Sequence, residues 1–458
     1  MKLINVNAAD SIKTKAQKLE RFLGEHYFHP GGMMYAMWYF NGDELRPFVS
    51  RDFDGMATFK IKAGTSMEAL HNNENSPYNA GQFLWSQCLR YEVTKDDEAL
   101  RYAAKAFRSL DLNYRLAEDR GEHGFFCKPY NLVYSTETSP DQYVPIAQGL
   151  WEYRKHCDRA TRQRIEQQML PAMSDWWRLR DYKIVYFDHE GDWLRHADAR
   201  CQYGPSYVVM HVMAHQLTGK QEYRDEADRV LEFCLPFAWR HDLLREQMLN
   251  EGKTFWPERL NGYEYDASRR KYLHLDWENY AAISYPATAL AWLIENDDTS
   301  NQPLMQHALA NYLRHARQPL TEDLMSRYWN QTDLDTGKCY PLVRPRISTN
   351  RKDYIVDFDW NFCAYASKIC WGEATARVAD IALLAHRHAT GFSPGALSLC
   401  RDILRRLNDD RLRWFIDPDG KQLMPEDIWL NRVLSSEVPA ATALTYWRAR
   451  AWNIDLDA

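Results

Sequence analysis

Residues 206–240, SYVVMHVMAHQLTGKQEYRDEADRVLEFCLPFAWR, combine two helical segments of different character. The first, which ends at Gly219, is apolar almost all the way round. In the second, apolar residues recur every three or four positions and charged residues fill the opposite face. A helix that is apolar on all sides is buried, whereas one with a polar face borders solvent. The stretch therefore predicts a buried helix that a short turn joins to an exposed helix.

The same alternation continues along the 458-residue chain, where each amphipathic segment precedes a more apolar one. Six outer helices that alternate with six inner helices describe an all-α fold, the (α/α)6 barrel built from six helical hairpins. No linker or low-complexity segment interrupts the pattern, so we expect a single domain over residues 1–458. The predicted pairs are 8–25 with 76–94, 95–117 with 140–156, 158–181 with 203–218, 220–241 with 277–295, 301–317 with 367–389, and 393–408 with 437–451.

The connection from each outer helix to its inner partner is long, and the connection to the next outer helix is short. Long loops gathered at one end of a barrel usually build a site. At that end, here named the mouth end, the inner helices present their N-termini, whose dipoles favour anionic groups. In the first long connection two apolar runs flank Asn41 and Gly42, which predicts a β-hairpin beside the mouth end.

Composition narrows the class of protein. The net charge of −6 gives no support to nucleic-acid or membrane-surface binding, and no apolar run is long enough to span a bilayer. Nine scattered cysteines without a Cys-x-x-Cys pair argue against a disulfide framework or a zinc cluster. With an N-terminus that lacks a signal peptide's apolar core, they indicate a cytoplasmic protein. The 17 Trp and 27 Tyr suit stacking on sugar rings, although large barrels also pack many aromatic residues.

Side chains that precede an inner helix should face the mouth end. The stretch STETSPDQY at residues 135–143 leads into the second inner helix and offers Asp141 and Gln142. A helix start alone would also explain this stretch, with Ser139 as the N-cap and Pro140 at the first helical position. In that case Asp141 has no catalytic role and only interacts favourably with the helix dipole. Upstream, GEHGFFCKPY supplies three further candidates for substrate contacts, which are His123, Lys128 and Tyr130.

The densest cluster of acids and aromatic residues is HLDWENY, at the start of the fourth inner helix. It offers Asp276, Trp277 and Glu278, and a helix cap would explain one of the two acids more easily than both. Glycoside hydrolysis needs one carboxylic acid to protonate the leaving oxygen and a second carboxylate to activate water or attack carbon. Asp141 and Glu278 are the expected pair, with Asp276 and Glu437 in reserve.

Further candidates for substrate contacts come from the other long connections. Arginine forks suit the carboxylate of a uronic acid, although loop salt bridges and helix caps are the ordinary alternative. No phosphate-binding loop or metal-ligand spacing occurs, so we expect neither cofactor nor metal, and His211 and His215 read as core histidines. These candidates are His71, Glu74, Arg195, His196, Tyr203, Arg344, Trp360, Trp371 and Glu437, with Glu373 and Arg377 close by.

The alternating hairpins, with acids at the inner-helix starts, resemble the six-hairpin glycosidase superfamily. Within it, GEHGFFCKPY followed by SPDQYVPIAQGLWEY is most similar to the unsaturated glucuronyl and rhamnogalacturonyl hydrolases. The resemblance implies that Asp141 is the general acid/base that protonates the double bond of a 4,5-unsaturated uronate and directs water onto it. The chain departs from those enzymes in two features. The acid that the glucuronyl hydrolases carry in the loop before this helix has only Glu122 as a candidate here, and the chain has an extra N-terminal hairpin.

Other functions remain open from the sequence. A polysaccharide lyase would use Tyr203, His123 or His196 as its base. A sugar 2-epimerase of the N-acylglucosamine type would need paired histidines, and His71, His123, His196 and His274 form no obvious pair. A non-catalytic carbohydrate-binding barrel is the last alternative. The expected partner is an oligosaccharide, and the expected state is a monomer or a homodimer.

Overall fold

The structure is a computed structural model of the whole chain. It describes residues 4–41, 44–53, 66–184, 197–198, 200–239, 263–266, 271–298, 301–327, 329–332, 339–341, 370–413, 415–416 and 433–458. In parts of this range, among them residues 200–202, 236–239 and 276–282 and most strands between residues 183 and 371, the backbone alone is described.

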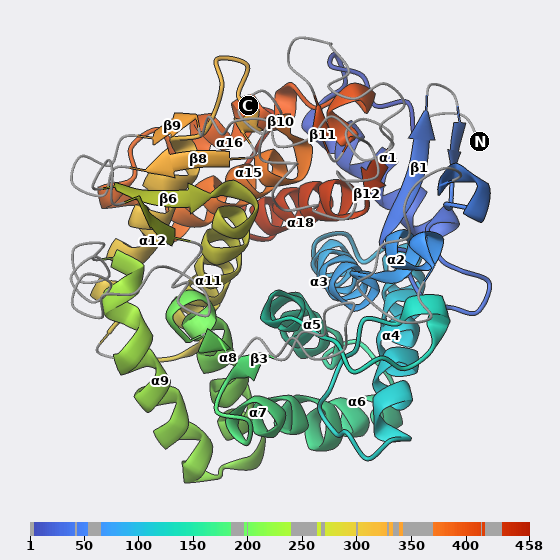
Figure 1. Cartoon of the computed structure of the whole chain (residues 1–458), viewed down its shortest axis with the longest axis vertical. Coiled ribbons are helices and arrows are strands. Elements are labelled where there is room, and N and C mark those ends of the chain that lie inside the picture. The colour runs from blue at the N-terminus through green and yellow to red at the C-terminus, as the bar shows by residue number, and fades with distance from the viewer. Residues whose placement is uncertain are drawn as a thin grey trace.

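Six inner helices form a closed ring, which Figure 1 views end-on. Each packs against the next in chain order, and α18 returns to pack against α3. Their all-round apolar sequence has the expected result, since α18 is buried from Glu437 through Ala449. The inner helices are α3 (Ser76–Thr94), α5 (Pro140–Tyr153), α8 (Arg200–Thr218), α11 (Asp276–Asn296), α15 (Gly372–His388) and α18 (Glu437–Ala451).

Outer helices cover this ring and alternate with the inner ones along the chain. They confirm the predicted (α/α)6 barrel, with boundaries within a few residues of those expected. The third outer segment departs from the prediction of one continuous helix. A π-helical turn, η3 (Ile165–Met169), interrupts it just before Pro171, and Pro171 lacks the N–H that would continue the helix. The outer elements are α1 (Ile12–His26), α4 (Asp97–Glu118), α6 (Arg159–Arg164) with α7 (Leu170–Arg178), α9 (Gln221–Trp239), α12 (Gln302–Arg317) and α16 (Ala396–Arg405).

Two glycines set the closest approach between inner helices. A Cβ atom on Gly81 of α3 would lie 2.6 Å from the backbone nitrogen of Ile146 on α5, and a Cβ on Gly149 would lie 2.5 Å from the carbonyl oxygen of Gly81. Real Cβ atoms do not approach other atoms this closely, so both positions require a residue without one. The first and second inner helices therefore touch through their backbones.

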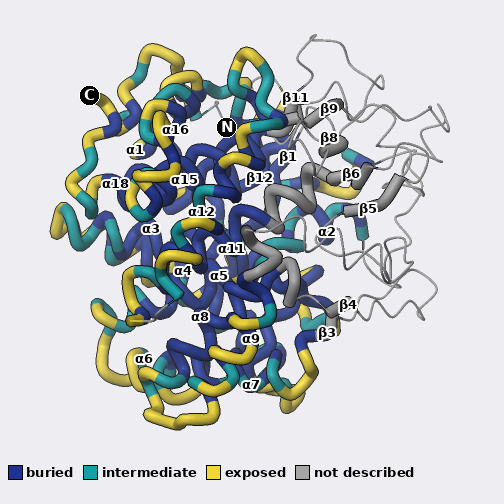
Figure 2. Tube along the Cα trace, turned by 90° about the vertical axis from the view of Figure 1, so that its left-hand side faces the viewer, coloured by how far each residue is buried: buried dark blue, intermediate teal, exposed yellow. Residues whose placement is uncertain are grey.

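Short strands gather at the mouth end, and Figure 2 shows two of them, β1 (Met37–Asn41) and β12 (Val433–Ser435), on the same side of the barrel as α2 (Met67–Asn73). The predicted hairpin is confirmed as β1 (Met37–Asn41) and β2 (Glu44–Arg46). Unexpectedly, β1 also pairs with β12 (Val433–Ser435) from the last long connection, with Met37 opposite Ser435. This pairing ties the first and sixth hairpins together where the ring closes.

Three further sheets in the long connections, like α2, were not predicted. The largest of these sheets has the strand order β5-β6-β8-β9. It joins the connections before α11 and α15, because β6 pairs with β8. No helix among the described residues is both long and apolar enough to cross a membrane. The strands are β3 (Lys183–Ile184) with β4 (Ala197–Asp198), β5 (Tyr263–Asp266), β6 (Lys271–Leu275), β8 (Trp329–Thr332) and β9 (Cys339–Pro341), and β7 (Ser326–Arg327), β10 (Cys370–Trp371) and β11 (Phe415–Ile416).

Candidate active site at the mouth end

Asp141 lies in the first turn of α5, which begins at Pro140 after Ser139. The Ser139 hydroxyl makes no hydrogen bond to the helix backbone and instead accepts one from the Gln142 amide at 3.1 Å. Burial raises the pKa of the Asp141 carboxyl, and the nearby charge of Glu437 adds to this rise. Lys128 and the Ser139 hydroxyl act in the opposite direction without cancelling it. Asp141 therefore holds its proton to a higher pH than an ordinary aspartate.

Lys128 reaches this helix start from the loop before it. Its ammonium lies 2.8 Å from an oxygen of Glu74, which follows α2, and its side chain is almost fully buried. The backbone N–H of Lys128 donates to the carbonyl of Glu137 at 2.8 Å, and the Tyr130 hydroxyl donates to the Glu137 carboxylate, also at 2.8 Å. These contacts fix a cation beside Asp141 without relying on a flexible surface side chain.

Glu437 is the first residue of α18 and lies on the other side of α3 from α5. Its Oε2 pairs with the guanidinium of Arg377 on α15, and its Oε1 accepts a hydrogen bond from the Asn75 amide at 3.3 Å. Its backbone N–H donates to the Ser435 hydroxyl at 3.2 Å, and that hydroxyl in turn donates to Glu373. The carboxylate is therefore held by groups from two other hairpins, the fifth and the first.

Arg377 is enclosed by aromatic rings. Its guanidinium carbon lies 4.9 Å from the ring centroid of Tyr78 on α3 and 4.9 Å from that of Tyr285 on α11. A third ring, Tyr203 on α8, lies 6.4 Å from Tyr285. Such contacts favour a cation that has been taken out of water. Tyrosines from three inner helices thus build an aromatic floor beneath the carboxylates.

Two of the histidine candidates, His71 and His123, lie within the described residues. His71 packs between Phe48 and Phe53, and its Nδ1 hydrogen-bonds the Met67 carbonyl at 2.7 Å. Burial lowers the pKa of His71 to about 4. His123 is exposed on its loop. The structure therefore brings Asp141, Lys128, Glu74 and Glu437 into one region, and His71 lies close enough to Glu74 for the charge of that carboxylate to act on its ring.

Several predicted residues lie beyond what the structure describes. Asp276 is the first residue of α11, and Trp277 and Glu278 follow it in that helix, so their backbone stands at the mouth end, while their side chains are outside the described set. Trp371 is placed only as backbone, in β10. Arg195, His196, Arg344 and Trp360 lie outside the described residues. Within the described residues, no three His, Cys, Asp or Glu side chains come together as metal ligands would.

Solved structures show where else this architecture occurs. No protein-family model and no curated protein matches the sequence. A sugar epimerase from a ruminal bacterium aligns over 97% of this chain and 98% of its own, with a TM-score of 0.53 and 10% identity. The cellobiose 2-epimerase from Bacillus thermoamylovorans B4167 aligns over 95% of this chain and 98% of its own, with a TM-score of 0.52 and 12% identity. A D-mannose isomerase aligns over 95% of this chain and 97% of its own, with a TM-score of 0.51 and 10% identity.

The chain shares its (α/α)6 barrel fold with these three proteins. Identities of 10–12% show a shared fold and nothing finer. The six-hairpin frame explains why the candidate residues meet, since all six inner helices begin at the same end. It also explains which residues sequence reasoning missed. Tyr78 and Tyr285 lie within inner helices rather than before them, and the only signal for them was a polar-tipped aromatic residue inside an otherwise apolar helix.

Proposed function

We propose that this protein is a carbohydrate-active enzyme that hydrolyses uronic-acid-containing oligosaccharides with Asp141 as its general acid. The observation that supports this most is the raised pKa of the Asp141 carboxyl at the start of α5. A general acid that works near neutral pH must retain its proton, and burial together with a nearby like charge achieves this. Glu437 supplies the like charge.

The cation beside Asp141 favours an acidic sugar. A lysine ammonium carries three donors, and within the described residues Glu74 accepts from Lys128. A uronate carboxylate that bound the same ammonium would place its sugar ring next to Asp141. The names of the structures that share the fold, a mannose isomerase and two epimerases, support a sugar as substrate without specifying the reaction.

The finer proposal is the hydration of a 4,5-unsaturated uronate, the reaction that the sequence resemblance implies. The protonated Asp141 carboxyl adds its proton to one carbon of the double bond, and the carboxylate that remains accepts a proton from the attacking water. The water oxygen bonds to the other carbon, which also carries the ring oxygen. The double bond is consumed, and the hemiketal that forms opens to a ketone as its bond to the ring oxygen breaks. The anomeric carbon is then a hemiacetal, which expels the neighbouring sugar as its alcohol and becomes an aldehyde, so the sum of the steps is hydrolysis by one water.

The test follows the conjugated double bond by its ultraviolet absorbance. We expect the protein to remove this absorbance from unsaturated uronyl disaccharides, and Asp141→Asn to slow the reaction by about 10²–10⁴-fold. Asp119→Asn is the matched control, because Asp119 is an exposed aspartate at the end of α4. Full activity of Asp141→Asn, or no loss of absorbance with any unsaturated substrate, would refute the proposal.

The same incubation separates the competing functions. A lyase acting on intact oligouronides increases the absorbance, and an ordinary hydrolase creates reducing ends without changing it. A sugar epimerase changes neither and instead converts the configuration of a free sugar, which NMR detects. Epimerisation by two histidines gains no support from His71 and His123, since the first is packed between Phe48 and Phe53 and the second is exposed.

A further inference from the structure

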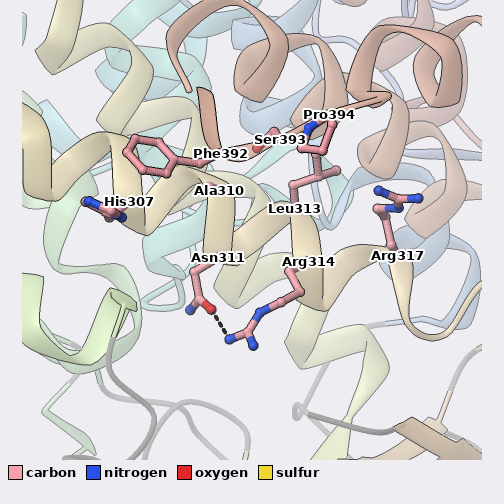
Figure 3. A pocket seen from close by; sticks show the side chains of 9 residues that line it. All are labelled: His307, Ala310, Asn311, Leu313, Arg314, Arg317, Phe392, Ser393 and Pro394. Carbon is pink, nitrogen blue, oxygen red and sulfur yellow. Dashed lines mark hydrogen bonds between the residues drawn. The ribbon is translucent and has the colours of Figure 1, made fainter. Parts of the chain in front are cut away.

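A second site lies on the outer wall of the barrel, on α12 and the turn that joins α15 to α16. The structure has a pocket of about 440 Å³ there, which Figure 3 shows from close by. Small-molecule sites usually have volumes of about 300–1,000 Å³, so the pocket can accommodate one monosaccharide-sized ligand. It is lined from α12 by two arginines and an apolar strip, and from the turn by Phe392, Ser393 and Pro394.

The charge of this pocket is positive and not balanced nearby. α12 contains no Asp or Glu, and Arg314 and Arg317 both line the pocket. The Arg314 guanidinium donates to the neutral amide oxygen of Asn311, a bond drawn in Figure 3, and within the described residues neither arginine forms an ion pair. The helix dipole explains part of this arrangement, since it places about half a negative charge at the C-terminus. Two guanidinium groups exceed that charge.

An aromatic ring stands beside these cations. Phe392 is 50% exposed, an unusual state for a phenylalanine, and its ring centroid lies 4.1 Å from that of His307. The His307 ring supports one part of the phenyl group, and the rest is open to a ligand. The C–H face of a sugar ring is a suitable partner for such a surface.

The turn that carries Phe392 is shaped in advance. It forms a 3₁₀ turn, η5 (Thr390–Phe392), closed by a hydrogen bond from the Phe392 N–H to the Ala389 carbonyl at 2.9 Å. The next residue, Ser393, lines the pocket with only 9% of its surface exposed, and its hydroxyl has no hydrogen-bond partner among the described residues. A buried hydroxyl without a partner costs free energy, so it marks a place where a ligand oxygen would be stabilised.

We infer that this pocket binds an anionic sugar, that is, a monosaccharide unit bearing a carboxylate or a phosphate. The anionic group pairs with Arg314 and Arg317, whose planar forks match both kinds of oxyanion. The sugar ring covers Phe392, and one of its hydroxyls bonds Ser393. The site is separate from the mouth end and does not depend on the reaction proposed there.

Titration calorimetry at low salt tests the assignment with four probes, which are glucuronate, glucose 6-phosphate, glucose and inorganic phosphate. We expect one or both anionic sugars to bind more tightly than glucose and phosphate, and the better of the two identifies the oxyanion. Arg314→Gln/Arg317→Gln should weaken this binding at least about tenfold, because it removes both charged donors. Asp141→Asn should leave it unchanged, which separates this site from the mouth end.

Arg101→Gln/Arg159→Gln is the matched control, since both arginines are exposed on other outer helices and its net charge equals that of the pocket variant. Ser393→Ala should weaken binding of the sugars and not of phosphate. Thermal unfolding of each variant shows that it is folded. Unchanged sugar binding by the pocket variant would overturn the inference, and so would inorganic phosphate that binds as tightly as the sugars.

Discussion

Arg377 and Glu437 form a buried ion pair that joins α15 to α18 at the mouth end. Each side chain is only 4% exposed, and Tyr78 and Tyr285 enclose the guanidinium. The pair therefore has two consequences. It fastens the last two inner helices together, and it places a negative charge close to Asp141, which adds to the rise in pKa that burial of this carboxyl causes.

Removal of the cation should destabilise the fold. Arg377→Met leaves Glu437 buried with the Asn75 amide as its remaining side-chain partner, and we expect the free energy of unfolding to fall by about 3–5 kcal/mol. Urea denaturation measures this. The control is Arg101→Met, which breaks an exposed pair with Glu98 and should cost less than about 1 kcal/mol. Equal losses in the two variants would contradict the assigned role of the buried pair.

The pH dependence of the proposed activity should respond in opposite directions to the two charges near Asp141. The protonated form of Asp141 is the acid, so activity falls as pH rises through its pKa. Lys128 lowers this pKa, so Lys128→Met should move the falling limb to higher pH. Glu437 raises it, so Glu437→Gln should move the limb to lower pH. Profiles of kcat against pH measure both shifts, and movement in the same direction would exclude Asp141 as the acid.

Glu20 should make the fold less stable as pH rises. Burial raises the pKa of its carboxyl to about 7, although Arg90 and Trp447 oppose the rise. Between 4.5, its ordinary value, and about 7, the unfolded chain loses this proton and the folded protein keeps it. Stability should therefore fall by about 3 kcal/mol over that interval and then level off.

Glu20→Gln removes this titration, so the difference in unfolding free energy between wild type and variant should depend on pH. Urea denaturation from pH 4.5 to 8 measures the difference. Glu232→Gln, at an exposed position of α9, is the matched control and should show none of this dependence. A difference that stays constant with pH would count against the raised pKa of Glu20.

His211 should have the opposite effect in acid. It is buried between α7 and α9, with its ring nitrogens hydrogen-bonded to the hydroxyls of Ser174 at 2.6 Å and Tyr182 at 2.7 Å. Burial lowers its pKa from 6.5 to about 4. As pH falls through this interval, this histidine binds a proton in the unfolded chain and stays neutral in the folded protein, so the free energy of unfolding falls.

The contribution of His211 amounts to about 3 kcal/mol when fully lost. His211→Gln should remove it, and unfolding free energies of wild type and variant from pH 7 to 4 measure the change. His215→Gln, on the same helix and outside the buried network, is the control. If the two variants lose stability equally with acid, His211 is not a source of the acid sensitivity.

Contact between the first two inner helices should not tolerate a methyl group. Gly81→Ala places a Cβ 2.6 Å from the Ile146 nitrogen, and the helices would have to separate. We expect a loss of about 1–3 kcal/mol or more, measured by thermal unfolding. Gly391→Ala is the control, because no atom lies within 4 Å of the added Cβ. A neutral Gly81→Ala would mean that the backbone contact is not needed.

The barrel itself was predictable because each hairpin repeats one local pattern. A helix such as α18 is buried wherever it lies in the ring, so its apolar sequence alone determined its place as an inner helix. The strand β12 was not predictable, because its partner β1 is about 400 residues away and such pairing leaves no local period. The α2 helix was missed for the same reason, since a short helix in a long connection carries too few turns to show periodicity.

The sequence by itself determined the six hairpins, the shared end at which the inner helices begin and the position of Asp141 in the first turn of α5, because helical period and turn chemistry are local. Only the tertiary structure decided the state of that carboxyl. Burial in the folded barrel raises its pKa, Lys128 from the preceding loop opposes this rise, and Glu437 from the last hairpin, itself held by Arg377, adds to it. Electrostatic interactions act through distance in space, and separation along the chain does not reveal it.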